Sequence, residues 1–337
     1  MPTMQHHFSL KNYNSFGIDV SAALYATPET PEELKGVLDQ YDFTNLPYLV
    51  MGEGSNLLFK GDFEGLVLNP RMKGIELVED ETGQVVVRVG AAENWDSWVE
   101  YATRQEWFGL ENLSLIPGSV GSAPVQNIGA YGVEMKDHFA WLEAWDLQQN
   151  LPVRLNGEDC GFGYRSSIFK TNARGRYIIT HVAFRLNKQP QLQLNYGPVK
   201  EAFTKSRGAT PLDLRNSIIK IRNQKLPDPG EFGNAGSFFK NPLVDRTIFK
   251  CIRVDYPEIP NFHDKENCVK IPAAWLIEKA GWKGKRTGKV GTWPTQPLVI
   301  VNYGGATGQE ILDFSEQIRH DVDKKFGVYL EREVNVV

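Results

Sequence analysis

The chain has 337 residues and a mass of 38.0 kDa, which is enough for two or three domains with buried cores. Hydrophobic residues make up 41% and charged residues 23%, as in ordinary globular proteins, and 37 basic against 41 acidic residues give a net charge of −4. This balance excludes a general attraction to nucleic acid or to an anionic membrane, and leaves a small anionic ligand possible.

The N-terminus, MPTMQHHFSLKNYN, has no basic region followed by an apolar run, and no apolar stretch approaches the ~18 residues of a membrane span. We therefore expect a cytoplasmic protein with neither a nucleic-acid nor a membrane partner. Cys160, Cys251 and Cys268 lie far apart and form no CxxC pair, which argues against a disulfide framework and against a metal site. We expect all three to be buried thiols.

In chain order, the first predicted element is a helix within residues 27–41, where Thr30 is the expected N-cap, followed by Pro31 and Glu33 in a capping-box pattern. Residues 46–59, LPYLVMGEGSNLLF, predict a buried strand, a glycine turn and a second apolar run. Residues 85–91 and 176–186 predict strands. The apolar spacing within residues 93–107 predicts an amphipathic helix between those strands.

Irregular mixing of short strands with a few helices indicates an α+β fold rather than regular βαβ alternation. The residue composition changes near residues 200–215, where a polar stretch leads into a helical segment and then a Pro/Gly-rich stretch. We place a domain boundary there. Beyond it we expect helices over residues 272–280 and 309–326, which glycines end, and then a closing strand over residues 328–337.

Two glycine-rich loops carry the first chemical signal. Residues 52–56, GEGSN, combine glycines with hydrogen-bonding side chains and suit a pyrophosphate, although a tight turn between two strands is an alternative. Residues 116–132, IPGSVGSAPVQNIGAYG, form a longer loop whose interleaved apolar residues argue against disorder. Together the loops predict a ligand with a diphosphate and a flat ring system.

Charged residues in three other segments allow more than one interpretation. Arg165 in FGYRSSIFK either grips a carboxylate or forms a structural salt bridge. Lys220, Arg222 and Lys225 either form a solvated helix face or clamp a second phosphate-bearing ligand. In LEREV, alternation along the expected strand puts Glu331 and Glu333 on one face, which points either to solvent or to a cavity.

Ser237 in NAGSFFKNP has no histidine within ten residues, and the chain has no GxSxG, GxGxxG, GxxxxGK[ST] or HExxH motif. A serine without a neighbouring base is a poor nucleophile. A proton donor needs only a held hydroxyl that another group can reprotonate.

These segments, together with KLPDP, occur in an order that resembles the UDP-N-acetylenolpyruvoylglucosamine reductases, flavoenzymes of peptidoglycan precursor synthesis, over residues 52–334. The YGPV stretch with Tyr196 is similar to the type I branch. The resemblance implies an FAD-binding PCMH or vanillyl-alcohol-oxidase-type region over residues 1–205, made of two α+β subdomains split near residue 70. It also implies a smaller α+β substrate domain over residues 206–337 and a monomeric chain.

The resemblance further implies noncovalent FAD, NADPH as co-substrate and UDP-N-acetylglucosamine enolpyruvate as substrate. By this resemblance Arg165, Ser237 and Glu333 are catalytic, with Ser237 as the proton donor. The implied cofactor-binding residues are Gly52, Glu53, Gly54, Ser55, Asn56, Pro117, Gly118, Ser119, Gly121, Ser122, Asn127, Gly129, Ala130 and Tyr131. The implied substrate-binding residues are Tyr196, Arg222, Lys225, Asn241 and Lys270.

Glu333 is preferred over Glu331 by motif alignment alone. Asn335 stands where the family often has another basic or polar residue, which weakens expectations about contacts from the extreme C-terminus. A noncovalent flavin oxidase of the same fold and a nucleotide-binding module without chemistry remain as alternative functions.

Overall fold

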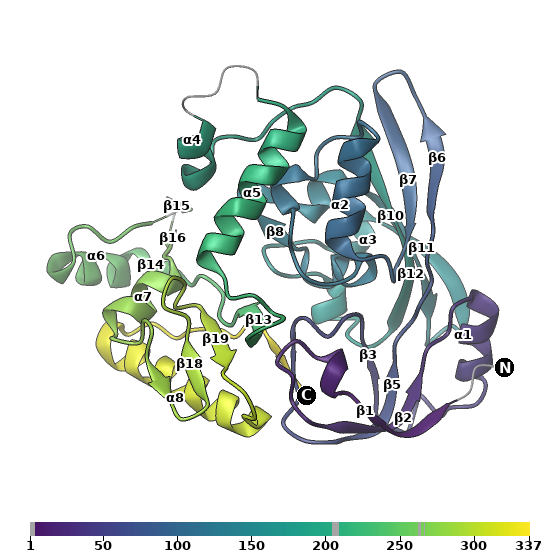
Figure 1. Cartoon of the computed structure of the whole chain (residues 1–337), viewed down its shortest axis with the longest axis horizontal. Coiled ribbons are helices and arrows are strands. Elements are labelled where there is room, and N and C mark those ends of the chain that lie inside the picture. The colour runs from purple at the N-terminus through teal and green to yellow at the C-terminus, as the bar shows by residue number, and fades with distance from the viewer. Residues whose placement is uncertain (1–3, 204–208, 262–263, 266) are drawn as a thin grey trace. The chain divides into compact units, whose positions relative to one another are not determined.

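A computed structural model of the chain describes residues 4–203, 209–261, 264–265 and 267–337 (Figure 1). Its mixture of strands and helices confirms the predicted α+β class. The chain divides into two compact units: the first contains residues up to Phe8, Ala22–Glu53 and Glu64–Arg222, and the second contains Ser9–Ser21, Gly54–Phe63 and Asn223–Val337. The predicted domain boundary between residues 205 and 206 lies outside the described residues.

The first unit contains two main sheets. One has the strand order β1-β2-β5-β3, and its strands are β1 (Gln5–Ser9), β2 (Ser21–Ala26), β3 (Tyr48–Val50) and β5 (Phe63–Leu68). The other has the order β11-β10-β12-β7-β6, and its strands are β6 (Ile75–Asp80), β7 (Gln84–Gly90), β10 (Phe139–Asp146), β11 (Leu151–Asn156) and β12 (Tyr177–Asn187). Residue 70, where we expect two subdomains to meet, lies between the last strand of the first sheet and the first strand of the second.

Helices and a small hairpin complete this unit. They are α1 (Pro31–Leu38), α2 (Trp95–Arg104), α3 (Gly157–Cys160), α4 (Gly197–Phe203), α5 (Pro211–Lys225), β8 (Gly129–Ala130) and β9 (Val133–Glu134). The last turn of α5 extends past the division into the second unit.

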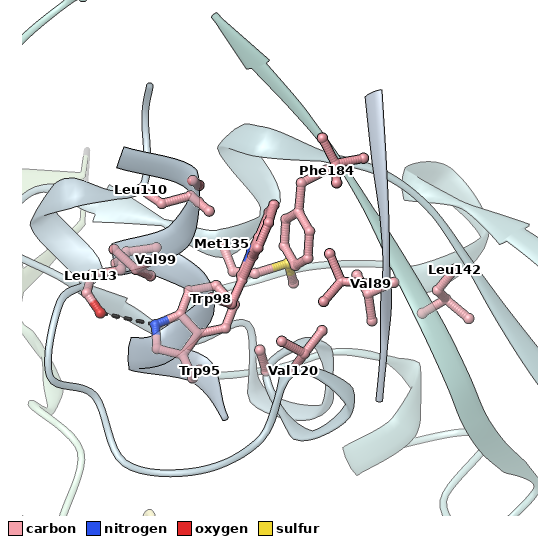
Figure 2. Packing of buried hydrophobic residues seen from close by; sticks show 14 of the residues in the cluster. Val89, Trp95, Trp98, Val99, Leu110, Leu113, Val120, Met135, Leu142 and Phe184 are labelled. Carbon is pink, nitrogen blue, oxygen red and sulfur yellow. Dashed lines mark hydrogen bonds between the residues drawn. The ribbon is translucent and has the colours of Figure 1, made fainter. Parts of the chain in front are cut away.

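The main core of the first unit forms where α2 packs on the five-stranded sheet (Figure 2). The rings of Trp95 and Trp98 lie 5.8 and 5.7 Å from that of Phe184 on β12. Buried aromatic rings of this size contribute much of a core's apolar area, and the Trp95 indole N–H is satisfied by the Leu113 carbonyl at 2.9 Å. This packing fixes the N-terminal turn of α2, on which the site depends.

The second unit is built from shorter strands and helices. Its strands are β4 (Leu57–Leu58), β13 (Gly233–Ser237), β14 (Leu243–Asp245), β15 (Asp264–Lys265), β16 (Cys268–Lys270), β17 (Arg286–Thr287), β18 (Val290–Thr292), β19 (Val299–Asn302) and β20 (Asn335–Val336). Its helices are α6 (Arg246–Asp255), α7 (Ala273–Lys279) and α8 (Gly308–Phe326). Their sheets have the orders β13-β19-β18-β17, β14-β16-β15 and β20-β4.

The predicted helices and the strands of the first half are confirmed as α1, α2, α7, α8, β3, β7 and β12. Thr30 caps α1 by accepting from the Glu33 amide at 3.1 Å, as its pattern predicts. None of the helices among the described residues is both long and apolar enough to cross a membrane.

Two expectations from the sequence are wrong. The segment after α8 is not a continuous strand, because its regular pairing among the described residues is limited to an isolated bridge at Arg332 and the two-residue β20. Residues 52–56 do connect two strands, β3 and β4, but each of these pairs elsewhere, β3 with β5 and β4 with β20. Cys251 is exposed and Cys268 half-buried, because α6 turns Phe249 and Ile252 inward and leaves Cys251 on its other face.

Cys160 is buried as expected. Burial, with a smaller contribution from Asp159, raises the pKa of its thiol to about 12, so it is an unreactive thiol at neutral pH.

Candidate functional site

Gly52, at the start of the first glycine-rich loop, meets the second loop inside the first unit. A Cβ added at Gly52 would lie 2.6 Å from the Ser119 hydroxyl oxygen, so only glycine lets these loops approach so closely. The Gly52 carbonyl accepts from the Asn69 side-chain amide at 2.9 Å, which fixes it from the other side. The start of the first loop and the second loop, far apart in sequence, therefore pack directly against each other.

The N-terminus of α2 holds both loops. The Asn94 side chain caps the helix by accepting from the Ser97 amide at 3.0 Å, and its amide nitrogen donates to the Glu53 carboxylate at 3.0 Å. The backbone of Asn94 also pairs with Ser119 in an isolated bridge. One cap residue thus contacts the first loop and the second.

The second loop is tied down by its own backbone. The amides of Val120 and Gly121 donate to Glu93 and Ala91 carbonyls, each at 2.9 Å, and a Cβ at Gly121 would lie 2.5 Å from that of Ala91. Gly121 therefore serves close packing of the loop against Ala91, and its amide is used within the protein.

Arg165 lies against the same loop. It adopts a left-handed backbone conformation, φ +52°, in a turn closed by mutual backbone bonds between Gly163 and Ser166. Its guanidinium donates to the Gly129 carbonyl, and the Asn127 side chain donates to the Gly163 carbonyl at 3.0 Å. These bonds join the FGYR segment directly to the end of the second loop. A left-handed backbone at a residue such as Arg165 is typical of a functional position.

Tyr131, at the end of that loop, contacts two of the expected substrate residues. Its ring packs edge to face on Tyr196 with centroids 5.6 Å apart, and its hydroxyl is hydrogen-bonded to the Arg222 guanidinium. Burial raises the pKa of Tyr131 and lowers that of Arg222. The buried Nε of Arg222 has no partner within the described part of the chain. Such an incompletely satisfied cation is suited to an anionic ligand.

In the second unit, three other predicted segments converge. The Glu333 amide donates to the Phe238 carbonyl at 2.8 Å, and the Glu333 carbonyl accepts from the Asn56 side chain at 3.2 Å across 277 residues of sequence. Phe238 directly follows the half-buried Ser237 at the end of β13. Asn56, Ser237 and Glu333 are therefore brought together, although no sequence proximity links them.

Glu331 and Glu333 are distinguished by their surroundings. Glu331 is 69% exposed and forms an ion pair with Lys240, whereas Glu333 is half-buried beside Phe238. The choice of Glu333 over Glu331, made from the sequence by alignment, stays a prediction.

Asn241 and Lys270 belong to the second unit, where Asn241 precedes β14 and Lys270 ends β16, the strand paired with it. The Asn241 side chain accepts from the amide of Ala273, the first residue of α7, at 2.9 Å. Lys270 is paired with Leu243 across β14 and β16. Lys225 is exposed at the end of α5, where its carbonyl accepts from the Thr295 hydroxyl at 2.8 Å.

Sequence reasoning missed the N-terminal residues of the second unit. Ser15 donates its amide to Gly54 and accepts from the Asn234 amide at 2.9 Å, so it joins the first loop to β13. A Cβ at Gly54 would lie 2.1 Å from the Tyr13 carbonyl oxygen. The turn signal NSFG was visible in the sequence, but nothing local showed what that turn would contact.

Each unit by itself offers groups that suit part of a dinucleotide-type flavin. In the first unit, the second loop has hydroxyls at Ser119 and Ser122 beside Gly52, and the Glu53 carboxylate is occupied by Asn94. In the second unit, the first loop ends in Ser55 and Asn56. Gly236, beside Ser237, has φ +67° and open space where a Cβ would stand. A flat ring could approach the chain there without a side chain in its way.

Comparisons with known proteins agree with this assignment. Residues 22–151 match an FAD binding domain, and residues 228–337 match the UDP-N-acetylenolpyruvoylglucosamine reductase C-terminal domain. Reductases of that name from Amoebophilus asiaticus and Pseudomonas aeruginosa are each 45% identical, the first over 99% of both chains and the second over 99% of this chain and 98% of its own. The crystal structure of the Thermus caldophilus enzyme is 26% identical, with a TM-score of 0.70 over 100% of this chain and 99% of its own.

Proposed function

The chain belongs to the UDP-N-acetylenolpyruvoylglucosamine reductase family and is an FAD oxidoreductase, and from this we propose that it reduces UDP-N-acetylglucosamine enolpyruvate to UDP-N-acetylmuramate with electrons from NADPH. The FAD is noncovalent, and NADPH and substrate use the site in turn. The observation that carries the proposal is the convergence of Asn56, Ser237 and Glu333 in the second unit.

Reduced FAD, when bound, would supply the hydride that the terminal vinyl carbon of the enolpyruvyl group needs. The added electrons move toward the adjacent carboxylate, where negative charge develops. Arg165 binds that carboxylate and stabilises the charge, as a preorganised guanidinium does. Its fixed turn and its bond to Gly129 keep it from reorganising during the step.

Ser237 donates its hydroxyl proton to the α-carbon, which completes the reduction. It lies at the end of β13, where Phe238 is anchored to Leu298 by a backbone bond of 2.8 Å. Glu333 assists the proton transfer step only when it is protonated or positioned by a partner, because an ionised carboxylate would repel the negative charge that develops on the substrate.

Arg222 and Lys225 on α5, with Tyr196, Asn241 and Lys270, bind the UDP part of the substrate. Arg222 is the strongest candidate for a diphosphate oxygen because its guanidinium is buried and incompletely bonded. The remaining residues supply the neutral and cationic donors that a nucleoside diphosphate requires.

The test separates the two half-reactions by following flavin absorbance anaerobically. In the unmodified protein, NADPH should bleach the flavin band and the enolpyruvyl substrate should restore it. In the Ser237→Ala variant, NADPH should bleach the flavin band at the same rate as in the unmodified protein. Recovery of the band on adding the enolpyruvyl substrate should be slower by about 10²–10⁴-fold, the usual contribution of a general acid.

The matched control for packing near Ser237 is Phe239→Leu, which changes a nearby side chain that has no proton to donate. Normal recovery in Ser237→Ala would exclude this serine as the proton donor. Rapid recovery with oxygen and none with the enolpyruvyl substrate would instead indicate an oxidase of the same fold. A protein that binds no flavin at all would contradict the cofactor assignment.

A further inference from the structure

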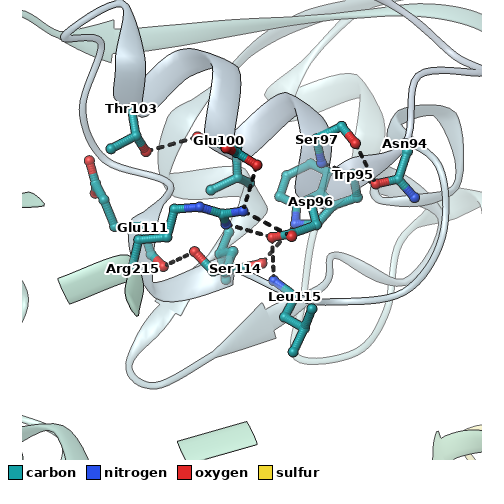
Figure 3. Close-up of polar contacts among 12 residues, drawn as sticks. Asn94, Trp95, Asp96, Ser97, Glu100, Thr103, Glu111, Ser114, Leu115 and Arg215 are labelled. Atoms are coloured by element: carbon teal, nitrogen blue, oxygen red, sulfur yellow. Dashed lines mark hydrogen bonds and ion pairs between the residues drawn. The ribbon is translucent and has the colours of Figure 1, made fainter. Parts of the chain in front are cut away.

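A buried ion pair joins α2 to α5 inside the first unit (Figure 3). The two terminal nitrogens of Arg215 donate to the two carboxylate oxygens of Asp96 at 2.6 and 2.9 Å. The Arg215 side chain is only 5% exposed, and Glu100 adds a longer contact of 3.5 Å. This bidentate geometry fixes both the distance between the helices and the rotation of α5.

Asp96 also holds the residue that precedes the second glycine-rich loop, residues 116–132, which we call the second flavin loop below. Its carboxylate accepts from the Leu115 amide at 2.5 Å, and Leu115 has a left-handed backbone, φ +58°. That conformation is unfavourable for a residue with a side chain, so a bond from outside is needed to maintain it. Leu115 immediately precedes residues 116–132.

Burial alone would raise the pKa of Asp96, but the bonds from Arg215 and from the Leu115 amide outweigh it and lower the pKa. Asp96 is therefore ionised at neutral pH. Its negative charge also acts on Arg222, whose own pKa is lowered first of all by burial.

Arg222 follows Arg215 by two helical turns, so both arginines project from the same side of α5. Both terminal nitrogens of Arg215 are bonded to carboxylates. Arg222 reaches Tyr131 on the flavin loop and keeps a buried Nε without a partner among the described residues. The first arginine is thus placed to anchor the helix, and the second to meet a ligand.

We propose that Asp96 and Arg215 are positioning residues that hold the Arg222 guanidinium beside the second flavin loop, in the place where it binds the anionic part of the substrate. This inference rests on the proposed function and names neither residue as a substrate contact. A buried ion pair adds little net stability compared with apolar packing, so its value here is the geometry that it imposes.

The experiment is a double-mutant cycle on Arg215 and Arg222 in the full-length holoenzyme. Arg215→Lys keeps the charge and loses the bidentate fork. It should raise both the KM for the enolpyruvyl substrate and the dissociation constant for UDP by about tenfold, the order of effect expected from a small displacement of a binding group. The rate of substrate-driven flavin recovery at saturation should change less than twofold.

Arg222→Gln should raise the same two constants directly. If Arg215 acts through Arg222, adding Arg215→Lys to Arg222→Gln should have almost no further effect. Arg104→Gln is the matched control, because it removes an exposed arginine that pairs with Glu100 on the same helix. It should leave both constants unchanged.

Fully additive effects of the Arg215 and Arg222 substitutions would overturn the proposal, as would an Arg215→Lys variant with unchanged constants. If Arg215→Lys loses flavin or melts early, Asp96→Asn takes its place in the same cycle with the same two criteria. Failure of the unmodified protein to turn over would contradict the proposed function. Because UDP affinity is measured without turnover, the positioning role is still tested in that case.

Discussion

At the scale of single residues, burial decides which ionisable groups change their behaviour. His181 on β12 is buried beside Arg88, with its Nδ1 3.0 Å from an Arg88 nitrogen and 3.5 Å from a Glu143 oxygen. Burial and then the Arg88 charge lower its pKa to about 4, against smaller opposing effects of Glu143 and Glu76. The imidazole is therefore neutral in the folded protein at neutral pH.

This shift predicts an acid-sensitive fold. Because the folded pKa is about 4 and the unfolded value is about 6.5, the unfolded chain binds more protons between these pH values. The free energy of unfolding should therefore fall as the pH falls from about 6.5 to about 4, by up to about 1.4 kcal/mol per pH unit. Urea midpoints measured between pH 7 and 5 test this.

His181→Asn should flatten that slope, and His320→Asn on the exposed side of α8 should not. Burial alone would raise the pKa of Glu143, but the hydrogen bonds from Arg88 and Arg154 outweigh it and lower the pKa, so this carboxylate loses its stabilising effect only below about pH 4.5. An equal slope in His181→Asn and the unmodified protein above pH 5 would contradict the assignment.

At the scale of elements, α8 shows how local signals and close packing act together. Thr307 caps its start through a capping box with Glu310, and Gly327 ends it in a left-handed conformation, φ +63°. Gly308, its first residue, lies against the Phe59 backbone, where an added Cβ would be 1.7 Å from the carbonyl oxygen. The caps are visible in the sequence, but the approach to Phe59 is not.

Two alanine substitutions in α8 should therefore differ in cost. Gly308→Ala must displace the backbone of residues 59–60 and should destabilise the protein by about 3 kcal/mol or more. Gly327→Ala meets open space and should cost only about 1 kcal/mol, for its left-handed backbone. Urea denaturation followed by tryptophan fluorescence compares them. Equal losses would show that Gly308 is not closely packed in solution.

At the scale of the whole molecule, the second unit is assembled from three separate stretches of chain. Asn302 donates its side-chain amide to the Phe16 carbonyl at 2.9 Å, and the Val337 amide donates to Leu58 at 2.9 Å. The last strand, β20, pairs with β4 from residues 57–58. Residues 9–21 and 54–63 are thus structural parts of the C-terminal unit.

A fragment of residues 206–337 should consequently fail to fold as a stable domain. It lacks the partner of β20 and the segment that covers β13 and β19, which leaves backbone groups and apolar side chains unsatisfied. Circular dichroism melting and limited proteolysis, with the full-length chain as the control, test this. A cooperative melt and a protease-resistant core in the fragment would contradict it.

Much of the secondary structure could be predicted because its signals are local. The capping residues Thr30 and Gly327 and the apolar spacing around Trp95 and Trp98 gave correct helices. The closing strand was wrong because a strand needs a neighbour, and residues 328–334 find only one bridge. The site residues were named through the resemblance, and their roles stay predictions.

The sequence by itself determined the α+β class, the main helices, and the family, since six motifs in one order are specific even without coordinates. Only the tertiary structure decided that Gly52 meets Ser119, that Glu333 lies between Asn56 and Phe238, and that Asp96 binds Arg215. The physical reason is that caps and periodicity act over a few residues. Contacts across a fold depend on how whole elements pack, which no short segment specifies.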